Sequence, residues 1–265
     1  MTDVPADGRI NTNLEDGIFR MEIDRPKKLN GFTPKMMREL AYAFTAFEND
    51  KTARCAVVSA AGPNFTAGLD LPKMAEAWQR GEPTHPDDAA DMFDLRPPFR
   101  TKPVIYAVQG ICFTIGIELM LGGDIVIAAD DCRFAQVEVK RGIVAAGGAT
   151  IRMVQRAGWG NAMKYLLTGD EFDAVTALRF NFVTEVVPAG TQVARAVELA
   201  RRIATVAAPL SVQATKQNAR HALEFGTAAA LEQMAQLRLT LRATEDAKEG
   251  VRSFSEKRPP RFQGR

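Results

Sequence analysis

Apolar and polar side chains alternate near the start of the chain and then give way to a helical period. Residues 17–24 (GIFRMEID) alternate with period two, which predicts a strand that ends at Arg25-Pro26. Thr33-Pro34 then provides a helix cap and a first helical residue. The apolar face of that helix consists of Met37, Leu40, Ala41, Phe44 and Phe47. A β-rich run at 54–60 (RCAVVSA) completes an order of strand, helix and strand that indicates an α/β class.

The most apolar stretch of the chain lies at residues 103–129. Polar residues interrupt it and four glycines break it up, so it does not fit a membrane span. We interpret it as buried core. It contains predicted strands at 102–110 and 124–130, and a third short strand is predicted at 132–139.

Residues 81–98 (GEPTHPDDAADMFDLRPP) show no sustained period and are rich in proline and acidic residues. The simpler interpretation is an excursion on the surface, and the alternative is a lid over a substrate pocket. Helical patterns follow at 149–157 and 161–168.

Beyond Pro188 the chain is alanine-rich and helical in period, with Pro209 and Gly226 as breaks. The helical segments are 190–206, 210–225 and 227–246. We therefore divide the chain into a core over 1–188 and a C-terminal helical region over 189–265. This region is expected to wrap the core or to meet a partner subunit.

Composition narrows the class of protein. The chain has 265 residues, enough for a large core, and a net charge of +2, which gives no reason to expect a nucleic-acid partner. The first dozen residues are polar and predict a loose terminus, without the pattern of a secretory signal. Three cysteines in apolar surroundings argue against disulfides and a zinc site, so we expect a reducing, cytoplasmic setting.

Several common catalytic motifs are missing from the sequence. It contains no G-x-S-x-G, no G-x-x-x-x-G-K-[ST], no H-E-x-x-H and no G-x-G-x-x-G after a strand. Its two histidines, His85 and His221, lie in the irregular segment and in the helical tail, where we expect surface positions. Of the common catalytic chemistries, the sequence leaves one based on carboxylates and supported by backbone N–H donors.

Two glutamates are conspicuous because their neighbours are apolar. Glu118 lies within the most apolar stretch, and Glu138 lies in AQVEVKRG. A buried carboxylate is costly unless it is paired or used, so the two suggest acid/base work. The alternative is structural: Glu138 could pair with Lys140 or Arg141, and Glu118 with an arginine of another segment.

Two turns could supply backbone donors. Residues 65–71 follow a strand, and residues 112–116 join a strand to the helix that carries Glu118. N–H groups at the start of a helix have no partner within the helix, so two such turns could bind a developing oxyanion. The alternative is that they are ordinary connections.

Seven segments can be compared with known families: IDRPKKLNGF, NFTAGLDL, AVQGICFTIGIELMLGGDIVIAAD, FAQVEVKRGIVAAGG, LLTGDEFDAVTAL, FVTEVV and EGVRSFSEKRPPRF. Together, from about Gly17 to Phe262, the chain resembles the crotonase, or enoyl-CoA hydratase/isomerase, superfamily. The resemblance implies an α/β fold with a spiral of β-β-α repeats and a C-terminal helical region that makes trimers, often paired into hexamers.

The resemblance also implies an activity, which is the addition of water across the double bond of an enoyl-CoA thioester. The N–H groups of Leu69 and Ile115 would form the oxyanion hole. Glu118 would act on the water and Glu138 on the proton of the α-carbon. Coenzyme A is part of the substrate, so no separate cofactor and no metal is expected.

The family's coenzyme A contacts carry over to five positions. Ala67 and Leu71 would border the adenine, and Lys28 would lie near the phosphates. Phe254 and Lys257, in SFSEK, match residues that reach the coenzyme, in some cases from a neighbouring subunit.

The chain also departs from the family pattern. The best-studied hydratases carry glycine at the position of Ile115 and a Pro-Gly pair at the position of Ala145-Ala146. A Δ3,Δ2-enoyl-CoA isomerase or another acyl-CoA enzyme of the superfamily is therefore the alternative function. A non-catalytic member that binds RNA or acts as a scaffold is a third hypothesis.

Overall fold

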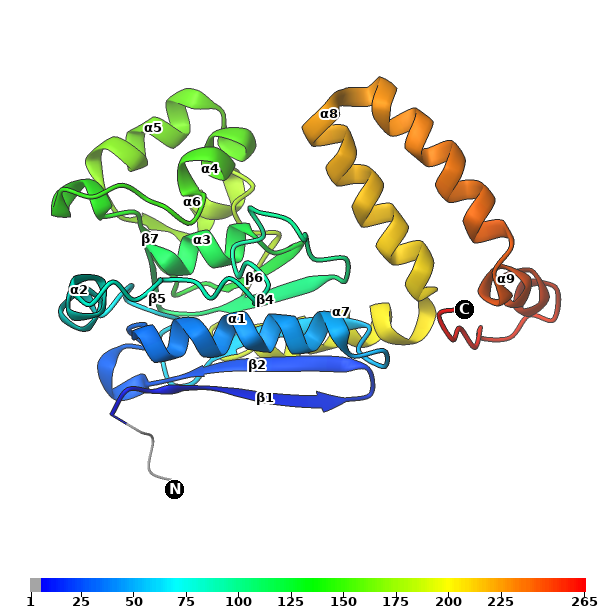
Figure 1. Ribbon diagram of the computed structural model, residues 1–265, viewed down its shortest axis with the longest axis horizontal. Coiled ribbons are helices and arrows are strands. Elements are labelled where there is room, and N and C mark those ends of the chain that lie inside the picture. The colour runs from blue at the N-terminus through cyan, green and yellow to red at the C-terminus, as the bar shows by residue number, and fades with distance from the viewer. Residues whose placement is uncertain (1–5) are drawn as a thin grey trace.

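A computed structural model describes residues 6–265 and contains two sheets (Figure 1). The larger has the order β1 (Arg9–Glu15), β2 (Ile18–Asp24), β3 (Cys55–Ala60), β4 (Val104–Val108), β6 (Ile125–Ala129) and β9 (Glu185–Val187). The smaller has the order β5 (Ile111–Phe113), β7 (Arg133–Ala135) and β8 (Phe172–Asp173). From β2 to β9 all neighbouring strands of the large sheet are parallel, which confirms the α/β class.

Helices cover both faces of the large sheet. Ala56 and Val58 belong to the core cluster on the side of α1 (Pro34–Asn49), whereas Cys55 and Val57 pack with α7 (Gln192–Val206). Successive residues of a strand point to opposite faces, so strands buried on both sides are apolar throughout. Every residue of β4 is accordingly buried.

The remaining helices connect the strands or follow them. They are η1 (Pro26–Lys28), α2 (Leu71–Gln79), α3 (Ile115–Leu121), η2 (Glu138–Arg141), α4 (Ala149–Ala157), α5 (Trp159–Thr168), α6 (Ala174–Arg179), α8 (Pro209–Arg242) and α9 (Glu245–Ser255). The predicted cap of α1 is confirmed, because the Thr33 hydroxyl accepts a hydrogen bond from Met36 N at 3.2 Å and Pro34 is the first helical residue. Within the described part of the chain, no helix is long and apolar enough to cross a bilayer.

Two local predictions were wrong. The terminus expected to be loose is ordered from residue 9, because residues 9–15 form strand β1, pair antiparallel with β2 and pack Ile10 and Leu14 against the core. Residues 1–5 of that expectation lie outside the described residues. The strand predicted at 132–139 ends at Ala135, and the chain then turns into η2. Glu138 is therefore the first residue of a short helix.

The C-terminal helices α8 and α9 extend away from the sheets, whereas α7 packs on the large sheet (Figure 1). The predicted break at Gly226 is confirmed, since this residue has φ 84° and ψ 172° within α8. The division into a core over 1–188 and a helical region over 189–265 stays a prediction.

Candidate active site

Helix α3 places Glu118 in the protein interior. All residues of this helix are buried, and Glu118 is only 5% exposed. Its Oε1 accepts hydrogen bonds from Gly147 N at 2.6 Å and from Ala149 N at 3.3 Å. These donors lie just before and at the start of α4, so backbone N–H groups, and no arginine, hold the carboxylate.

The electrostatic surroundings of Glu118 favour a carboxyl group that exchanges its proton near neutral pH. The pKa of Glu118 is raised to about 7, mainly by burial and also by the nearby carboxylate of Glu138, while the N–H donors and Arg152 oppose the rise. A general base is most effective when its pKa is near the working pH.

This raised pKa predicts a dependence of stability on pH. Between the ordinary carboxyl pKa and about 7, folded Glu118 holds its proton more tightly than the unfolded chain does, so its contribution to stability is present at low pH and is lost as pH rises through about 7. Glu118→Gln does not titrate. We expect this variant to exceed the wild type in free energy of unfolding by about 3 kcal/mol at pH 8, and to match it near pH 4.

Denaturant unfolding at the two pH values measures this difference. Glu15→Gln, at an exposed position of β1, is the matched control and should track the wild type at both pH values. If Glu118→Gln changed the free energy of unfolding by the same amount at pH 4 and at pH 8, ionisation of the Glu118 carboxyl would not destabilise the fold.

Glu138 is the second buried carboxyl group of the site. It is 8% exposed, its Oε1 accepts a hydrogen bond from Gln136 Nε2 at 3.3 Å, and its Oε2 is buried without a partner. Burial raises the pKa of Glu138. An unpaired buried oxygen is rare in proteins, and among residues 6–265 nothing donates to this one.

The structural alternative for the two glutamates is not found. Lys140 donates to Gly169 O at 2.8 Å and lies 3.7 Å from Asp170, away from Glu138. Across residues 6–265, no ion pair involves Glu118 or Glu138.

The two predicted donor turns lie side by side in parallel register. Thr66 N donates to Ile111 O at 2.9 Å, and Phe113 N donates to Thr66 O at 3.0 Å, which pairs Thr66 with Cys112. Leu69 and Ile115 each follow this pair by three residues. The register therefore brings both to the same end of the paired segments.

Their N–H groups are not used by the fold. Phe32 N donates to Gly68 O and Asp70 N to Phe32 O, so the bonds of this parallel bridge involve the neighbours of Leu69 and leave its own N–H directed elsewhere. Ile115 is the first residue of α3 and has no acceptor within that helix. Among the hydrogen bonds of the described residues, neither N–H group has a partner.

The two turns touch just before these residues. Gly68 has φ 115°, and a Cβ added to it would lie 2.5 Å from Thr114 Oγ1. Thr114 itself has φ 50° and ψ −114°. A positive φ is strained for a β-branched residue, by roughly 1–3 kcal/mol.

The irregular segment 81–98 contributes a wall beside Glu118. A Cβ on Gly147 would lie 2.7 Å from Phe93 Cε1 and 2.7 Å from Glu118 Oε2. Asp91 and Asp94 are buried, and Arg152 donates a hydrogen bond to the carbonyl of Phe93. The expectation of a surface excursion is therefore wrong for residues 89–95, which are buried or half-buried, whereas residues 96–98 are exposed as expected.

Sequence reasoning missed Gln136 and Gly147. Both act on the carboxyl groups through contacts between segments, Gln136 by its amide and Gly147 by its backbone N–H. A signal existed for Gln136 only, because it is a polar side chain two residues before Glu138 in an otherwise apolar run.

Three of the predicted coenzyme contacts lie near the donor turns. Ala67 is half-buried and donates its N–H to Leu29 O at 2.9 Å, which brings η1, with the exposed Lys28, beside it. Leu71 is the first residue of α2 and is exposed.

Phe254 and Lys257 are at the far end of the chain from these residues. Phe254 lies on α9 and is 86% exposed, and Lys257 follows the helix. In Figure 1, α9 lies on the side opposite to α2. A single chain therefore does not bring Phe254 and Lys257 to the other predicted contacts.

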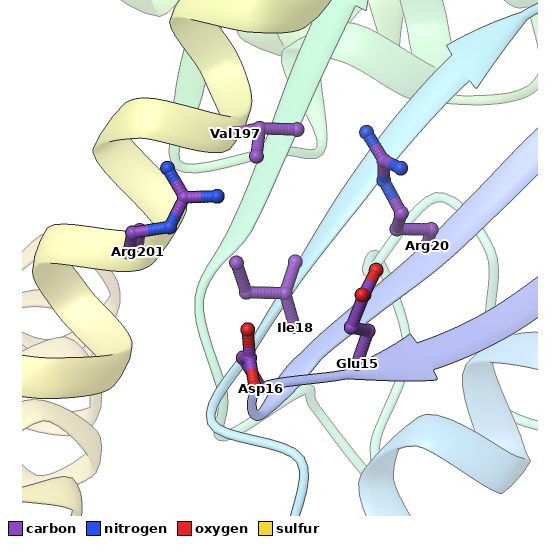
Figure 2. A pocket seen from close by; sticks show the side chains of 6 residues that line it. All are labelled: Glu15, Asp16, Ile18, Arg20, Val197 and Arg201. Atoms are coloured by element: carbon purple, nitrogen blue, oxygen red, sulfur yellow. The ribbon is translucent and has the colours of Figure 1, made fainter.

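Two surface cavities lie elsewhere. Figure 2 shows one of about 180 Å³ between the β1–β2 turn and α7, lined by Glu15, Asp16, Ile18, Arg20, Val197 and Arg201. A second, of about 300 Å³, lies beside the first turns of α1 and α2 and is lined mainly by charged side chains. Neither includes Glu118 or Glu138.

Comparison with known proteins identifies the family. Residues 13–265 match the profile described as Enoyl-CoA hydratase/isomerase. The 2,3-dehydroadipyl-CoA hydratase of Escherichia coli is 33% identical, with 94% of this chain and 96% of that protein covered. The 1,2-epoxyphenylacetyl-CoA isomerase of Escherichia coli is 34% identical, with 97% and 98% covered.

Solved structures agree with this match. The crystal structure of a probable enoyl-CoA hydratase/isomerase from Mycobacterium abscessus superimposes with a TM-score of 0.92 at 43% identity, covering 97% of this chain and 98% of that one. The fold is thus the crotonase fold that the sequence predicted. The chain belongs to the enoyl-CoA hydratase/isomerase family, whose members are enzymes that act on acyl-CoA thioesters.

Proposed function

We propose that this enzyme is an enoyl-CoA hydratase that adds water across the α,β double bond of an enoyl-CoA thioester. The observation that carries the proposal is a pair of buried carboxyl groups, Glu118 and Glu138, which have no ion pair within residues 6–265. In the same described part of the chain, the N–H groups of Leu69 and Ile115 at adjoining turns have no acceptor. Hydration needs both features, because water must be deprotonated while charge builds on the thioester oxygen.

The oxyanion is the first requirement. As the oxygen of water bonds to the β-carbon, electrons of the double bond move toward the thioester carbonyl, whose oxygen becomes negative. The N–H groups of Leu69 and Ile115 would stabilise this enolate. Because they are backbone groups, the apolar side chains at both positions are compatible with the role. Loss of such a donor commonly costs about 10²–10³ in rate.

The proton transfers are the second requirement. Glu118 accepts a proton from the attacking water, for which its pKa of about 7 provides an ionised fraction at neutral pH. Glu138 delivers a proton to the α-carbon, and its raised pKa helps it to hold that proton. The product is a 3-hydroxyacyl-CoA, a net addition of one water. Its hydroxyl comes from the attacking water and its α-hydrogen from Glu138, and exchange with solvent then removes the proton from Glu118 and restores the proton of Glu138.

Coenzyme A would bind along the donor turns. Lys28, Ala67 and Leu71 of one chain provide one side of the site, while Phe254 and Lys257 would reach the coenzyme from a neighbouring subunit. The coenzyme is part of the substrate, and no further cofactor or metal is proposed. The three cysteines are free and buried, which supports a cytoplasmic setting.

An isomerase is the second candidate function. The departures from the family pattern favour it, since Ile115 adds a side chain at the acyl site and Ala145-Ala146 replaces a Pro-Gly pair close to Gly147, a donor to Glu118. Moving a double bond requires only that a proton be shuttled, whereas hydration also requires a positioned water.

A panel of 2-enoyl-CoA substrates of increasing chain length tests the proposal. We expect conversion to the 3-hydroxyacyl-CoA, with a preferred chain length, as followed by loss of the conjugated thioester absorbance. Migration of the double bond in 3-enoyl-CoA substrates without hydration of any 2-enoyl-CoA would favour the isomerase.

The assembly is also predicted. Large apolar side chains on α8 and α9 are exposed in the single chain: Leu223, Phe225, Leu231, Met234, Leu239, Val251 and Phe254. We expect them to be covered in a trimer or a dimer of trimers. Sedimentation velocity at micromolar concentration measures this, and a monomer would contradict both the assembly and the contribution of Phe254 to a neighbour's site.

A further inference from the structure

Thr114 combines two unfavourable features at one position. Its φ of 50° lies in the left-handed region, which disfavours β-branched side chains. Its Oγ1 is buried and makes no hydrogen bond with any of residues 6–265. Buried hydroxyl groups are normally paired, and strained residues persist where the surrounding structure over-determines them, often at functional sites.

The backbone of Thr114 is fixed on both sides. Its N–H donates to Ala135 O at 2.9 Å, and its carbonyl accepts from Ile117 N at 2.9 Å and from Glu118 N at 3.2 Å. The residue therefore joins the small sheet to the helix that carries Glu118. These contacts hold the strained conformation, and the side chain contributes nothing to them.

The hydroxyl group lies where the two turns meet. Ile115 follows Thr114 directly. Across the turn, a Cβ on Gly68 would lie 2.5 Å from Thr114 Oγ1, so the hydroxyl rests against the residue that precedes Leu69. A glycine at position 68 is what makes room for it.

We propose that Thr114 Oγ1 donates a third hydrogen bond to the thioester oxygen of the substrate, beside the N–H groups of Leu69 and Ile115. The inference rests on the proposed function, since it assumes an acyl-CoA thioester with its oxygen at the adjoining turns. A hydroxyl rotates freely and carries one donor hydrogen, so it can turn toward an acceptor that arrives between the turns.

This assignment gives Thr114 a larger effect on the reaction than on ligand binding. The thioester oxygen becomes negative as the enolate forms, and a hydrogen bond to a charged acceptor is stronger than one to a neutral carbonyl. Removal of the hydroxyl should therefore lower kcat more than it raises KM.

Three variants separate the hydroxyl from packing and backbone strain. Thr114→Val keeps the branched shape and the strain but removes the hydroxyl, Thr114→Ser keeps the hydroxyl, and Thr114→Gly removes both the hydroxyl and the strain. We expect kcat with a 2-enoyl-CoA to fall by about tenfold or more in the Val and Gly variants, and to stay within about threefold of the wild type in the Ser variant. Thermal unfolding verifies that each variant is folded.

A binding measurement tests the contact without turnover. Calorimetry compares butyryl-CoA with its thioether analogue, butyl-CoA, which lacks the carbonyl oxygen. Thr114→Val should weaken the binding of butyryl-CoA by severalfold and leave the affinity for butyl-CoA unchanged. Three results would each overturn the proposal. The first is equal affinity of Thr114→Val and wild type for butyryl-CoA, and the second is an equal loss of affinity for butyryl-CoA and butyl-CoA in Thr114→Val. The third is an equal loss of kcat in the Ser and Val variants.

The two proposals fail in different ways. If the wild type binds butyryl-CoA but hydrates no enoyl-CoA, the proposed reaction is wrong and the calorimetric comparison still decides the role of Thr114. If the wild type binds neither ligand, both are overturned.

Discussion

Replacing Glu118 with glutamine is expected to reduce the rate of enoyl-CoA hydration by about 10²–10⁴-fold, the range that a general base supplies. Glutamine keeps the shape of the side chain, and its carbonyl oxygen can still accept from Gly147 N and Ala149 N, but it cannot take a proton from water. Stopped-flow or steady-state hydration of crotonyl-CoA measures the loss.

Glu138→Gln should reduce hydration to a similar degree for a different reason. Here the α-carbon loses its proton donor, so exchange of the α-proton of a saturated acyl-CoA with D₂O should fall most in this variant. Water addition should fall most in Glu118→Gln. The exposed Glu15→Gln is the control for both and should keep full activity.

Near-normal hydration by Glu118→Gln would show that Glu118 is a structural carboxyl group, and the isomerase would then be the favoured function. Full activity of both variants would refute the assignment of acid/base roles altogether. The two results are distinguishable, because an isomerase that shuttles one proton would still depend on one of the two glutamates.

Gly68→Ala is the second change with a large expected effect. The added methyl group would lie 2.5 Å from Thr114 Oγ1, and Gly68 has φ 115°, where an L-residue is strained. The side chain of Thr114 or the turns themselves must shift, and we expect the N–H groups of Leu69 and Ile115 to lose their alignment. We expect kcat to fall by about 10²–10³-fold, as when an oxyanion donor is lost.

Gly81→Ala provides the matched control. Gly81 also has a positive φ, of 71°, but no atom lies within 4 Å of the added Cβ, so only backbone strain is introduced. Both variants should lose some stability, by about 1 kcal/mol from strain, while only Gly68→Ala loses activity. Equal activity of the two variants would show that the contact between the turns does not matter for the reaction.

Local features of the fold could be predicted where one signal is sufficient. Thr33-Pro34 caps a helix because the hydroxyl and the ring act within one turn of the chain. Gly226 breaks α8 because it adopts a conformation that other residues avoid. The burial of Glu118 and Glu138 was likewise foreseeable, since both are surrounded in sequence by apolar residues.

Features that depend on distant segments could not be predicted. Residues 9–15 are mostly polar, and they become a strand because β2 offers a partner and the core accommodates Ile10 and Leu14. The N–H groups that hold Glu118 come from a glycine-rich turn 29 and 31 residues away. Nearly every residue type has a backbone N–H, so the sequence does not reveal which residues donate. Phe93 likewise reaches the site through a segment without any period.

Isotope incorporation tests the central claim, that two carboxyl groups and backbone donors add water to an enoyl-CoA. Crotonyl-CoA is incubated with the wild-type enzyme in D₂O enriched in oxygen-18, and the thioester is analysed by mass spectrometry. The account predicts a 3-hydroxyacyl-CoA that carries oxygen-18 at the β-carbon and deuterium at the α-carbon. Deuterium exchange or migration of the double bond without any incorporation of oxygen-18 would contradict it.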